Sequence, residues 1–248
     1  MRRRSLLQSS AAAVGALSTT PLAAGAAHAV AHAAAPGRAR GDSGEALRVH
    51  IVTFDGVEEL DVFGPFEVFS LAARAHPVTV KLVTGGEAAE VTYSFGTKVA
   101  AEAWAPHDAD LVVVPGGGFS RRDGPGVWAE IGKGELPSAL RAAHEAGVTI
   151  LGICTGVIVL SAAGLTTGRT CTTHHLARSY LSQQGARVVD QRVVDDGDLV
   201  TAGGVSSGID GALWLVEREL GSAAATHAES ILEFERRGTV LRTPATSP

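Results

Sequence analysis

Apolar runs alternate with amphipathic segments along most of the chain. The runs LVVV at 111–114 and VTILGI at 148–153 are rich in branched aliphatic residues, as is typical of strands covered on both faces. The segment at 136–147, between them, places its apolar residues at helical spacing. Strands that alternate with helices predict an α/β fold, a three-layer sandwich built on a mostly parallel sheet.

The same pattern predicts the individual elements. We expect strands at 47–54, 78–84, 110–118, 148–154 and 169–173, and hairpins at 90–103 and 191–204. We expect helices at 60–75, 136–147, 157–164, 175–185, 206–221 and 223–237. Pro65 suits the first turn of its helix, and Ser206 or Ser207 suits the N-cap position of another.

The first 29 residues differ from the rest of the chain. Arginines at 2–4 precede an Ala-rich, weakly apolar stretch, and small residues at 27 and 29 suit a cleavage site. This pattern predicts an export signal over 1–29. The paired arginines resemble the twin-arginine type, and an ordinary secretory leader is the alternative. We therefore expect an exported protein, secreted or periplasmic. The remainder divides into a flexible linker (30–46), an α/β domain (47–238) and a polar tail (239–248).

Charge and composition indicate which kinds of ligand or binding partner the protein is suited to. The chain carries 21 Lys and Arg against 26 Asp and Glu, a formal net charge of −5. An acidic protein of this kind is a poor candidate for nucleic-acid binding. Its histidines and cysteines show no metal-ligand spacing, no glycine-rich phosphate loop is present, and no apolar run suits a membrane anchor. We expect a small-molecule substrate and neither a metal nor a cofactor.

Cys154 carries the strongest candidate chemistry. It stands in the stretch Gly-Ile-Cys-Thr-Gly at 152–156, between a buried strand and an apolar helix, which is the cysteine form of a nucleophile elbow. The N-terminus of the following helix is expected to lower the pKa of the thiol from its usual value of about 8.5. Two alternatives stay open, a core cysteine without chemistry and a disulfide with Cys171.

A glycine run ends the strand that is predicted to lie next to the elbow. The backbone N–H groups of Gly116, Gly117 and Gly118 can approach a ligand closely because these residues have no side chain. Together with the N–H of Thr155, they are expected to form a pocket for a developing oxyanion. A plain turn is the alternative for this run.

Several polar residues have competing interpretations. The apolar neighbours of Asp61 favour a partly buried carboxyl with a raised pKa, and an acidic residue in a first helical turn is the alternative. Glu58 and Glu59 are expected to be solvated. His174 could face the site, with a histidine bonded to the backbone at a helix start as the alternative. Asp210 is expected to have a packing or helix-dipole role.

Four segments together resemble the ThiJ/PfpI superfamily, also described as class I glutamine amidotransferase-like. They are DGVEELDVFGPFEVF (55–69), VVVPGGG (112–118), GICTGVIVLSAAGLTTGRTCTTHH (152–175) and DDGDLVTAGGVSSGID (195–210). The resemblance spans residues 47–236 and is closest to the isocyanide hydratases. It implies a flavodoxin-like fold and a homodimer.

The resemblance also implies roles for individual residues. Cys154 would be the nucleophile that attacks the isocyanide carbon, Asp61 the general acid/base, and Thr155 a hydrogen-bonding partner. Water would then release an N-substituted formamide. The peptidase branch has a histidine directly after the cysteine, where this chain has Thr155, which disfavours proteolysis. The alternatives are a non-catalytic ligand- or redox-sensing domain, or another activity of the superfamily such as glyoxalase or peptidase.

Overall fold

The computed structural model describes residues 45–243 of the chain. The predicted export signal (1–29) lies wholly outside the described residues, and so does nearly all of the predicted linker (30–46). The predicted α/β domain (47–238) lies within them.

A nine-stranded sheet forms the centre of the described part of the chain. Its strands are β1 (Leu47–Val52), β2 (Val78–Thr84), β3 (Ala89–Thr92), β4 (Lys98–Ala103), β5 (Leu111–Val114), β6 (Thr149–Ile153), β9 (Val193–Asp196), β10 (Leu199–Ala202) and β11 (Leu241–Arg242). Their order is β11-β9-β10-β6-β5-β1-β2-β4-β3. Neighbours pair in parallel except in the hairpins β9–β10 and β3–β4. This arrangement confirms the predicted flavodoxin-like α/β fold.

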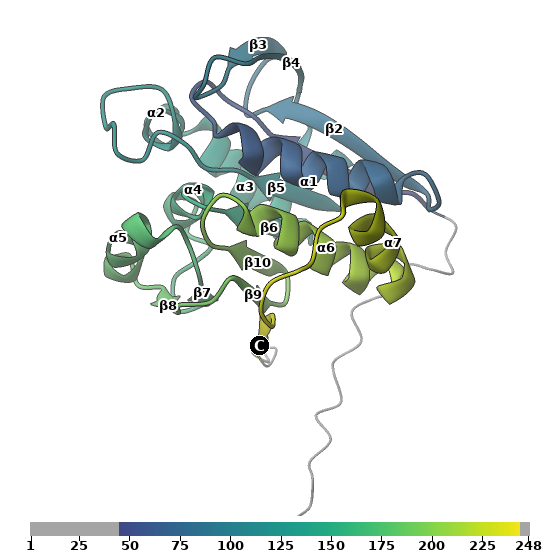
Figure 1. Ribbon diagram of the computed structural model, residues 1–248. Helices are drawn as coiled ribbons and strands as arrows, with labels where there is room; N and C mark the ends of the chain where they lie inside the picture. Colours follow the sequence, from purple (N-terminus) through teal and green to yellow (C-terminus); the bar gives the residue numbers. More distant parts are fainter. Residues whose placement is uncertain (1–44, 244–248) are drawn as a thin grey trace, which may run out of the picture. The chain divides into compact units, whose positions relative to one another are not determined.

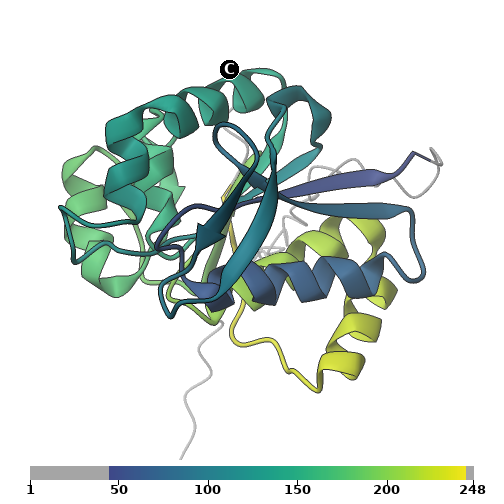
Figure 2. The same ribbon diagram turned by 90° about the horizontal axis from the view of Figure 1, so that it is seen from above.

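Helices cover both faces of the sheet (Figure 1). They are α1 (Glu59–Ala72), α2 (Val127–Lys133), α3 (Glu135–Glu145), α4 (Gly156–Ala162), α5 (Arg178–Gln183), α6 (Ser207–Leu220) and α7 (Ser222–Leu232). Helices α1, α6 and α7 contact one another, whereas α2, α3 and α5 contact α4. Figure 2 shows the two groups on opposite sides of the sheet. Because helices lie on both sides, every residue of β5 and β10 is buried.

The sequence predicted Pro65 in the first turn of its helix, but Pro65 lies inside α1. The helix begins at Glu59, so the proline removes one backbone hydrogen bond from its middle. The Gly64-Pro65 pair faces α6, where a Cβ on Gly64 would lie 2.9 Å from the side chain of Ile209. Both residues of the pair are buried. The close contact of the two helices therefore offsets the cost of a helix-breaking residue.

The segment at 169–173, predicted as a strand of the main sheet, lies outside that sheet. Only Thr170–Cys171 is a strand, β7, and it pairs in parallel with β8 (Arg187–Val188) in a separate two-stranded sheet. The residue after β7 bonds to β10 through a side chain, since the Thr172 N–H donates to Thr201 Oγ1 at 3.0 Å. This side-chain link replaces the backbone ladder that the pattern predicted.

The N-terminus of α6 and the C-terminus of α7 also differ from the prediction. Ser206 takes the N-cap position of α6, but its hydroxyl forms no cap and accepts a hydrogen bond from Arg192 at 3.1 Å. The last predicted helix, 223–237, ends at Leu232, and the chain returns to the sheet beyond residue 238 as β11. Helix α2 has no counterpart among the predicted helices.

The backbones of β5 and α4 touch at Gly156. A Cβ there would lie 2.1 Å from the carbonyl oxygen of Val114 and 2.5 Å from that of Pro115. Because backbone atoms cannot move aside cheaply, we expect Gly156→Ala to lower the free energy of unfolding by at least about 3 kcal/mol. Urea unfolding measures this change.

Gly132→Ala is the matched control for this substitution. Gly132 lies in α2 with open space around its Cα, so alanine is expected to stabilise the helix by up to about 1 kcal/mol. Equal stabilities of the two variants would show that the β5–α4 contact does not require glycine.

Candidate active site

Cys154 stands at the turn between β6 and α4. Its φ is 54°, and Glu233 is the only other non-glycine residue with a positive φ among those described. This conformation costs about 1–2 kcal/mol, so the surrounding structure must hold it. The Cys154 N–H donates to the carbonyl oxygens of Ala202 at 3.0 Å and Gly203 at 2.9 Å. The predicted elbow is therefore confirmed as a backbone turn.

The glycine run after β5 lies beside the elbow, but two of its three N–H groups are already bonded. The Gly116 N–H donates to Asp61 Oδ2 at 2.9 Å, and the Gly117 N–H donates to Thr155 Oγ1 at 3.0 Å. The N–H of Gly118 has no acceptor among the described residues. The structure thus brings Asp61, the glycine run and Thr155 together. The oxyanion pocket stays a prediction, for which Gly118 offers an uncommitted N–H.

Asp61 is buried at the start of α1, with a side chain that is 0% exposed. Burial raises the pKa of its carboxyl to about 7; the charge of Glu58 acts in the same direction, and the hydrogen bond from Gly116 acts against both. Its other oxygen, Oδ1, has no well-aligned hydrogen-bond partner among the described residues. The predicted rise in pKa is confirmed in direction. The carboxyl can therefore hold or release a proton near neutral pH.

The thiol of Cys154 lies against this carboxyl, and its pKa is raised, where the sequence had predicted a lowered value. The residue is 6% exposed, and this burial is the main cause of the rise in its pKa. The negative charge of Asp61 and a hydrogen bond to it act in the same direction. Hydrogen bonds from the N–H and hydroxyl of Thr155 lower the pKa only in part. The short helix α4 does not outweigh burial beside a carboxylate.

Thr155 links the glycine run to the sulfur. Its Oγ1 accepts the hydrogen bond from Gly117, and its hydroxyl and backbone N–H interact with the Cys154 side chain. Negative charge on the sulfur would strengthen these bonds, because a charged acceptor binds donors more tightly. Thr155 is therefore placed to stabilise the sulfur as it becomes nucleophilic.

His174 and Cys171 have structural surroundings of their own. His174 precedes the 3₁₀ helix η3 (His175–Ala177), and its Nδ1 accepts a hydrogen bond from the Leu176 N–H at 3.3 Å. This is the backbone-bonded alternative that the sequence left open. Both cysteines are buried free thiols, so the structure contains no disulfide between Cys154 and Cys171.

The other acidic residues differ in their surroundings. Glu58 and Glu59 are half-buried, not fully solvated as predicted. Glu59 Oε1 accepts a hydrogen bond from the Phe95 N–H at 2.8 Å, which joins the start of α1 to the β3–β4 turn. Asp210 is paired with the Arg192 guanidinium at 2.7 Å, in agreement with a packing role.

Sequence reasoning missed the residues that form hydrogen bonds with the backbone N–H and carbonyl groups of Cys154. The carbonyl groups of Ala202 and Gly203 accept the Cys154 N–H, and the Thr173 hydroxyl donates to the Cys154 carbonyl oxygen at 2.6 Å. All three lie within segments that carry the family resemblance, but no pattern in those segments marks them as partners of Cys154.

Within residues 45–243, no group of three or more His, Cys, Asp or Glu side chains is arranged to hold a metal ion. No helix in the same range is long and apolar enough to cross a membrane.

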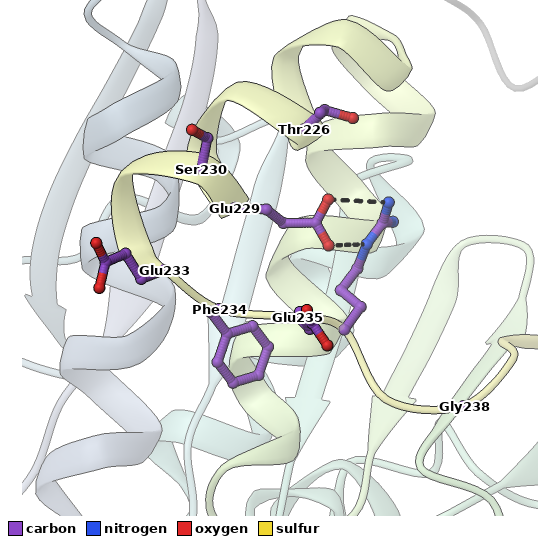
Figure 3. A pocket seen from close by; sticks show the side chains of 8 residues that line it. Thr226, Glu229, Ser230, Glu233, Phe234, Glu235 and Gly238 are labelled. Carbon is purple, nitrogen blue, oxygen red and sulfur yellow. Dashed lines mark hydrogen bonds and ion pairs between the residues drawn. The ribbon is translucent and has the colours of Figure 1, made fainter.

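A separate hollow opens on α7 and the segment after it (Figure 3), lined by residues between 226 and 238. Arg236 is one of the lining residues, and its guanidinium bonds Glu229 at 2.7 Å and also pairs with Glu217. None of the predicted site residues lines this hollow. We therefore assign no chemistry to it.

Comparisons with known proteins identify relatives of the sequence and of the fold. A family model described as the DJ-1/PfpI family matches residues 47–218. Isonitrile hydratase of Pseudomonas putida is 32% identical over 191 residues, which cover 76% of this chain and 79% of that protein. A ThiJ/PfpI family protein from Pseudomonas syringae superposes with a TM-score of 0.67 at 24% identity, covering 77% of this chain and 76% of the other. Schizosaccharomyces pombe DJ-1 superposes with a TM-score of 0.64 at 21% identity, covering 76% and 100%.

The contact between Asp61 and Cys154 yields a prediction about thiol reactivity. The charge of Asp61 raises the pKa of the thiol, so Asp61→Asn is expected to lower that pKa by about one unit or more. An asparagine can still accept the hydrogen bond from Gly116. The pH dependence of alkylation by iodoacetamide, followed on the Cys154 peptide by mass spectrometry, measures the shift.

Glu67→Gln is the control for this measurement, because Glu67 is an exposed carboxylate on the same helix. It is expected to leave the alkylation midpoint where the wild type has it. An unchanged midpoint in Asp61→Asn would mean that the carboxyl does not act on the sulfur.

Proposed function

The chain belongs to the DJ-1/PfpI family, and on this premise we propose that it is a cysteine-dependent hydratase of isocyanides. The proposed reaction adds water to R–N≡C and yields the formamide R–NH–CHO. The contact between the Cys154 thiol and the Asp61 carboxyl carries the proposal, because it joins a nucleophile to a proton carrier. The 32% identity with an isonitrile hydratase supports the choice of substrate class.

The first half of the reaction forms a thioimidate. Sulfur bonds to the terminal carbon while the Asp61 carboxylate takes the thiol proton, so that no free thiolate has to exist in the buried site. Asp61 then gives this proton to the same carbon, which yields R–N=CH–S–Cys154. A carboxyl with a pKa of about 7 suits both transfers, since it accepts and returns a proton at similar cost.

The second half consumes water and restores the enzyme. Asp61, again a carboxylate, takes a proton from water as the oxygen bonds to the thioimidate carbon, and it passes this proton to the nitrogen. The carbon–sulfur bond then breaks as the new hydroxyl group loses its proton to Asp61, which hands it to the departing sulfur. The formamide leaves, and Asp61 is again a carboxylate. The N–H and hydroxyl of Thr155 stabilise the departing sulfur, because they already interact with it.

Several features named from the sequence stay predictions. They are the oxyanion pocket of the glycine run (116–118) with the Thr155 N–H, the homodimer and export by the twin-arginine route. The proposed chemistry depends on none of them, because its proton transfers use only Cys154, Asp61 and water.

Turnover of an isocyanide tests the proposal directly. We expect purified protein to remove the infrared band of cyclohexyl isocyanide and to produce the formamide. Cys154→Ala is expected to abolish turnover with the fold intact. Asp61→Asn is expected to slow it by about a hundredfold or more, because the proton carrier is lost.

Cys171→Ser is the control, since Cys171 is a buried free thiol with no role in the proposed steps. It is expected to keep wild-type turnover. If the wild type leaves the isocyanide band intact while the Cys154 thiol is shown to be reduced, the substrate assignment is wrong. A ligand- or redox-sensing role would then be the better account.

The pH dependence of kcat/KM tests the direction of the first proton transfer. Asp61 must be a carboxylate to take the thiol proton, and its pKa is raised to about 7. We therefore expect kcat/KM to rise with pH, reach half of its plateau near pH 7, and stay level above it. A profile that falls across the same range would mean that Asp61 must be protonated, which contradicts its role as the base.

A further inference from the structure

Two buried threonines follow β7, and their hydroxyls bond in different directions. Thr172 and Thr173, called the strap here, are both 0% exposed. The Thr172 hydroxyl donates to the Gln191 carbonyl oxygen at 2.7 Å, whereas the Thr173 hydroxyl donates to the Cys154 carbonyl oxygen at 2.6 Å. The proposed reaction uses neither residue. The strap therefore offers two hydroxyl-to-carbonyl hydrogen bonds of similar length, a partly buried one to Gln191 and a buried one that reaches the elbow.

The Cys154 carbonyl depends on Thr173 for its hydrogen bond. The first turn of α4 does not supply a donor, since the Ile158 N–H bonds to the Thr155 carbonyl at 3.0 Å. Among the described residues, the Thr173 hydroxyl is the only donor to the Cys154 carbonyl. A buried carbonyl without a hydrogen-bond partner is destabilising, because folding has removed its bonds to water and replaced them with nothing. Loss of the hydroxyl would therefore favour a backbone rotation that finds another donor.

The strap is itself fixed to the sheet. The Thr172 N–H donates to Thr201 Oγ1 at 3.0 Å, and β10, which contains Thr201, pairs in parallel with β6. The Cys154 N–H bonds to carbonyl groups at the end of β10. Both backbone polar groups of Cys154 are thus held by parts of one rigid frame, and its left-handed φ is maintained from two sides.

We propose that Thr173 is a positioning residue, which holds the backbone of Cys154 in the left-handed turn that keeps its sulfur against Asp61. Its hydroxyl touches no reacting atom and acts only through the Cys154 carbonyl. Asp61 is the titratable group that acts on the sulfur, and Glu58 acts on Asp61 in turn. The effect on turnover rests on the proposed function. The effect on the sulfur position holds for any chemistry at Cys154.

The test compares Thr173→Val, which removes the hydroxyl at nearly constant shape, with Thr173→Ser, which restores it. In Thr173→Val the sulfur moves from Asp61, so the pH midpoint of Cys154 alkylation is expected to fall by about one unit or more. With cyclohexyl isocyanide, kcat is expected to fall about tenfold or more with KM little changed. Thr173→Ser is expected to keep the wild-type midpoint and kcat.

Thr172→Val is the matched control, because it removes the hydroxyl of an equally buried residue of the same strap, which bonds Gln191 instead of the elbow. It is expected to lower the melting temperature as Thr173→Val does, and to leave the alkylation midpoint unchanged. Equal midpoints in Thr173→Val, Thr172→Val and the wild type would overturn the proposal. If Thr173→Val and Thr173→Ala both fail to fold while Thr172→Val folds, the hydroxyl serves stability and the proposal is also overturned.

The alkylation measurement separates this inference from the proposed function. If the wild type does not hydrate isocyanides, the hydratase assignment fails, but the alkylation midpoints of the same variants still report where the sulfur lies. A shift in Thr173→Val alone would then support the positioning role for a different chemistry at Cys154.

Discussion

A buried strand has to turn into a helix within two residues, Cys154 and Thr155, and this constraint shapes the carboxyl edge of the sheet. The left-handed turn is unfavourable for a residue with a side chain, so it exists only because other elements bond both of its backbone groups. The turn also brings the backbones of β5 and α4 into contact, which demands glycine at 116 and 156. The left-handed turn at Cys154 thus depends on four other parts of the chain: the end of β5, the start of α4, the end of β10 and Thr173 after β7.

The same turn sets the electrostatics of the site. It buries the sulfur almost completely and makes Asp61 its neighbour, and both the burial and the charge of Asp61 favour the neutral thiol. The buried carboxyl in turn holds its proton more tightly than a solvated one would. Because the sulfur resists ionisation, the proposed reaction has the Asp61 carboxylate take the thiol proton only as the sulfur bonds to carbon. The surroundings of the sulfur favour such a coupled transfer over a preformed thiolate.

Much of the fold follows from local pattern. Continuous branched aliphatic runs identify β5 and β6 because both faces of these strands are covered, and Gly147 and Gly185 end helices because they adopt a positive φ. The prediction is wrong where a distant partner decides the outcome. Pro65 lies inside α1, where its glycine neighbour packs closely against α6, and β7 lies outside the main sheet, to which Thr172 bonds through the side chain of Thr201.

The sequence by itself determined the α/β class, the elbow at Cys154 and the glycine run beside it, because glycine spacing and apolar runs act over a few neighbouring residues. The family resemblance, and not a local pattern, joined Asp61 to the elbow. Only the tertiary structure decided the direction of the thiol pKa, the use of the Gly116 and Gly117 N–H groups, and the link from Thr173 to the elbow. These depend on burial and on hydrogen bonds between residues far apart in the chain. No local pattern records such distances, since they arise only when the strands and helices pack.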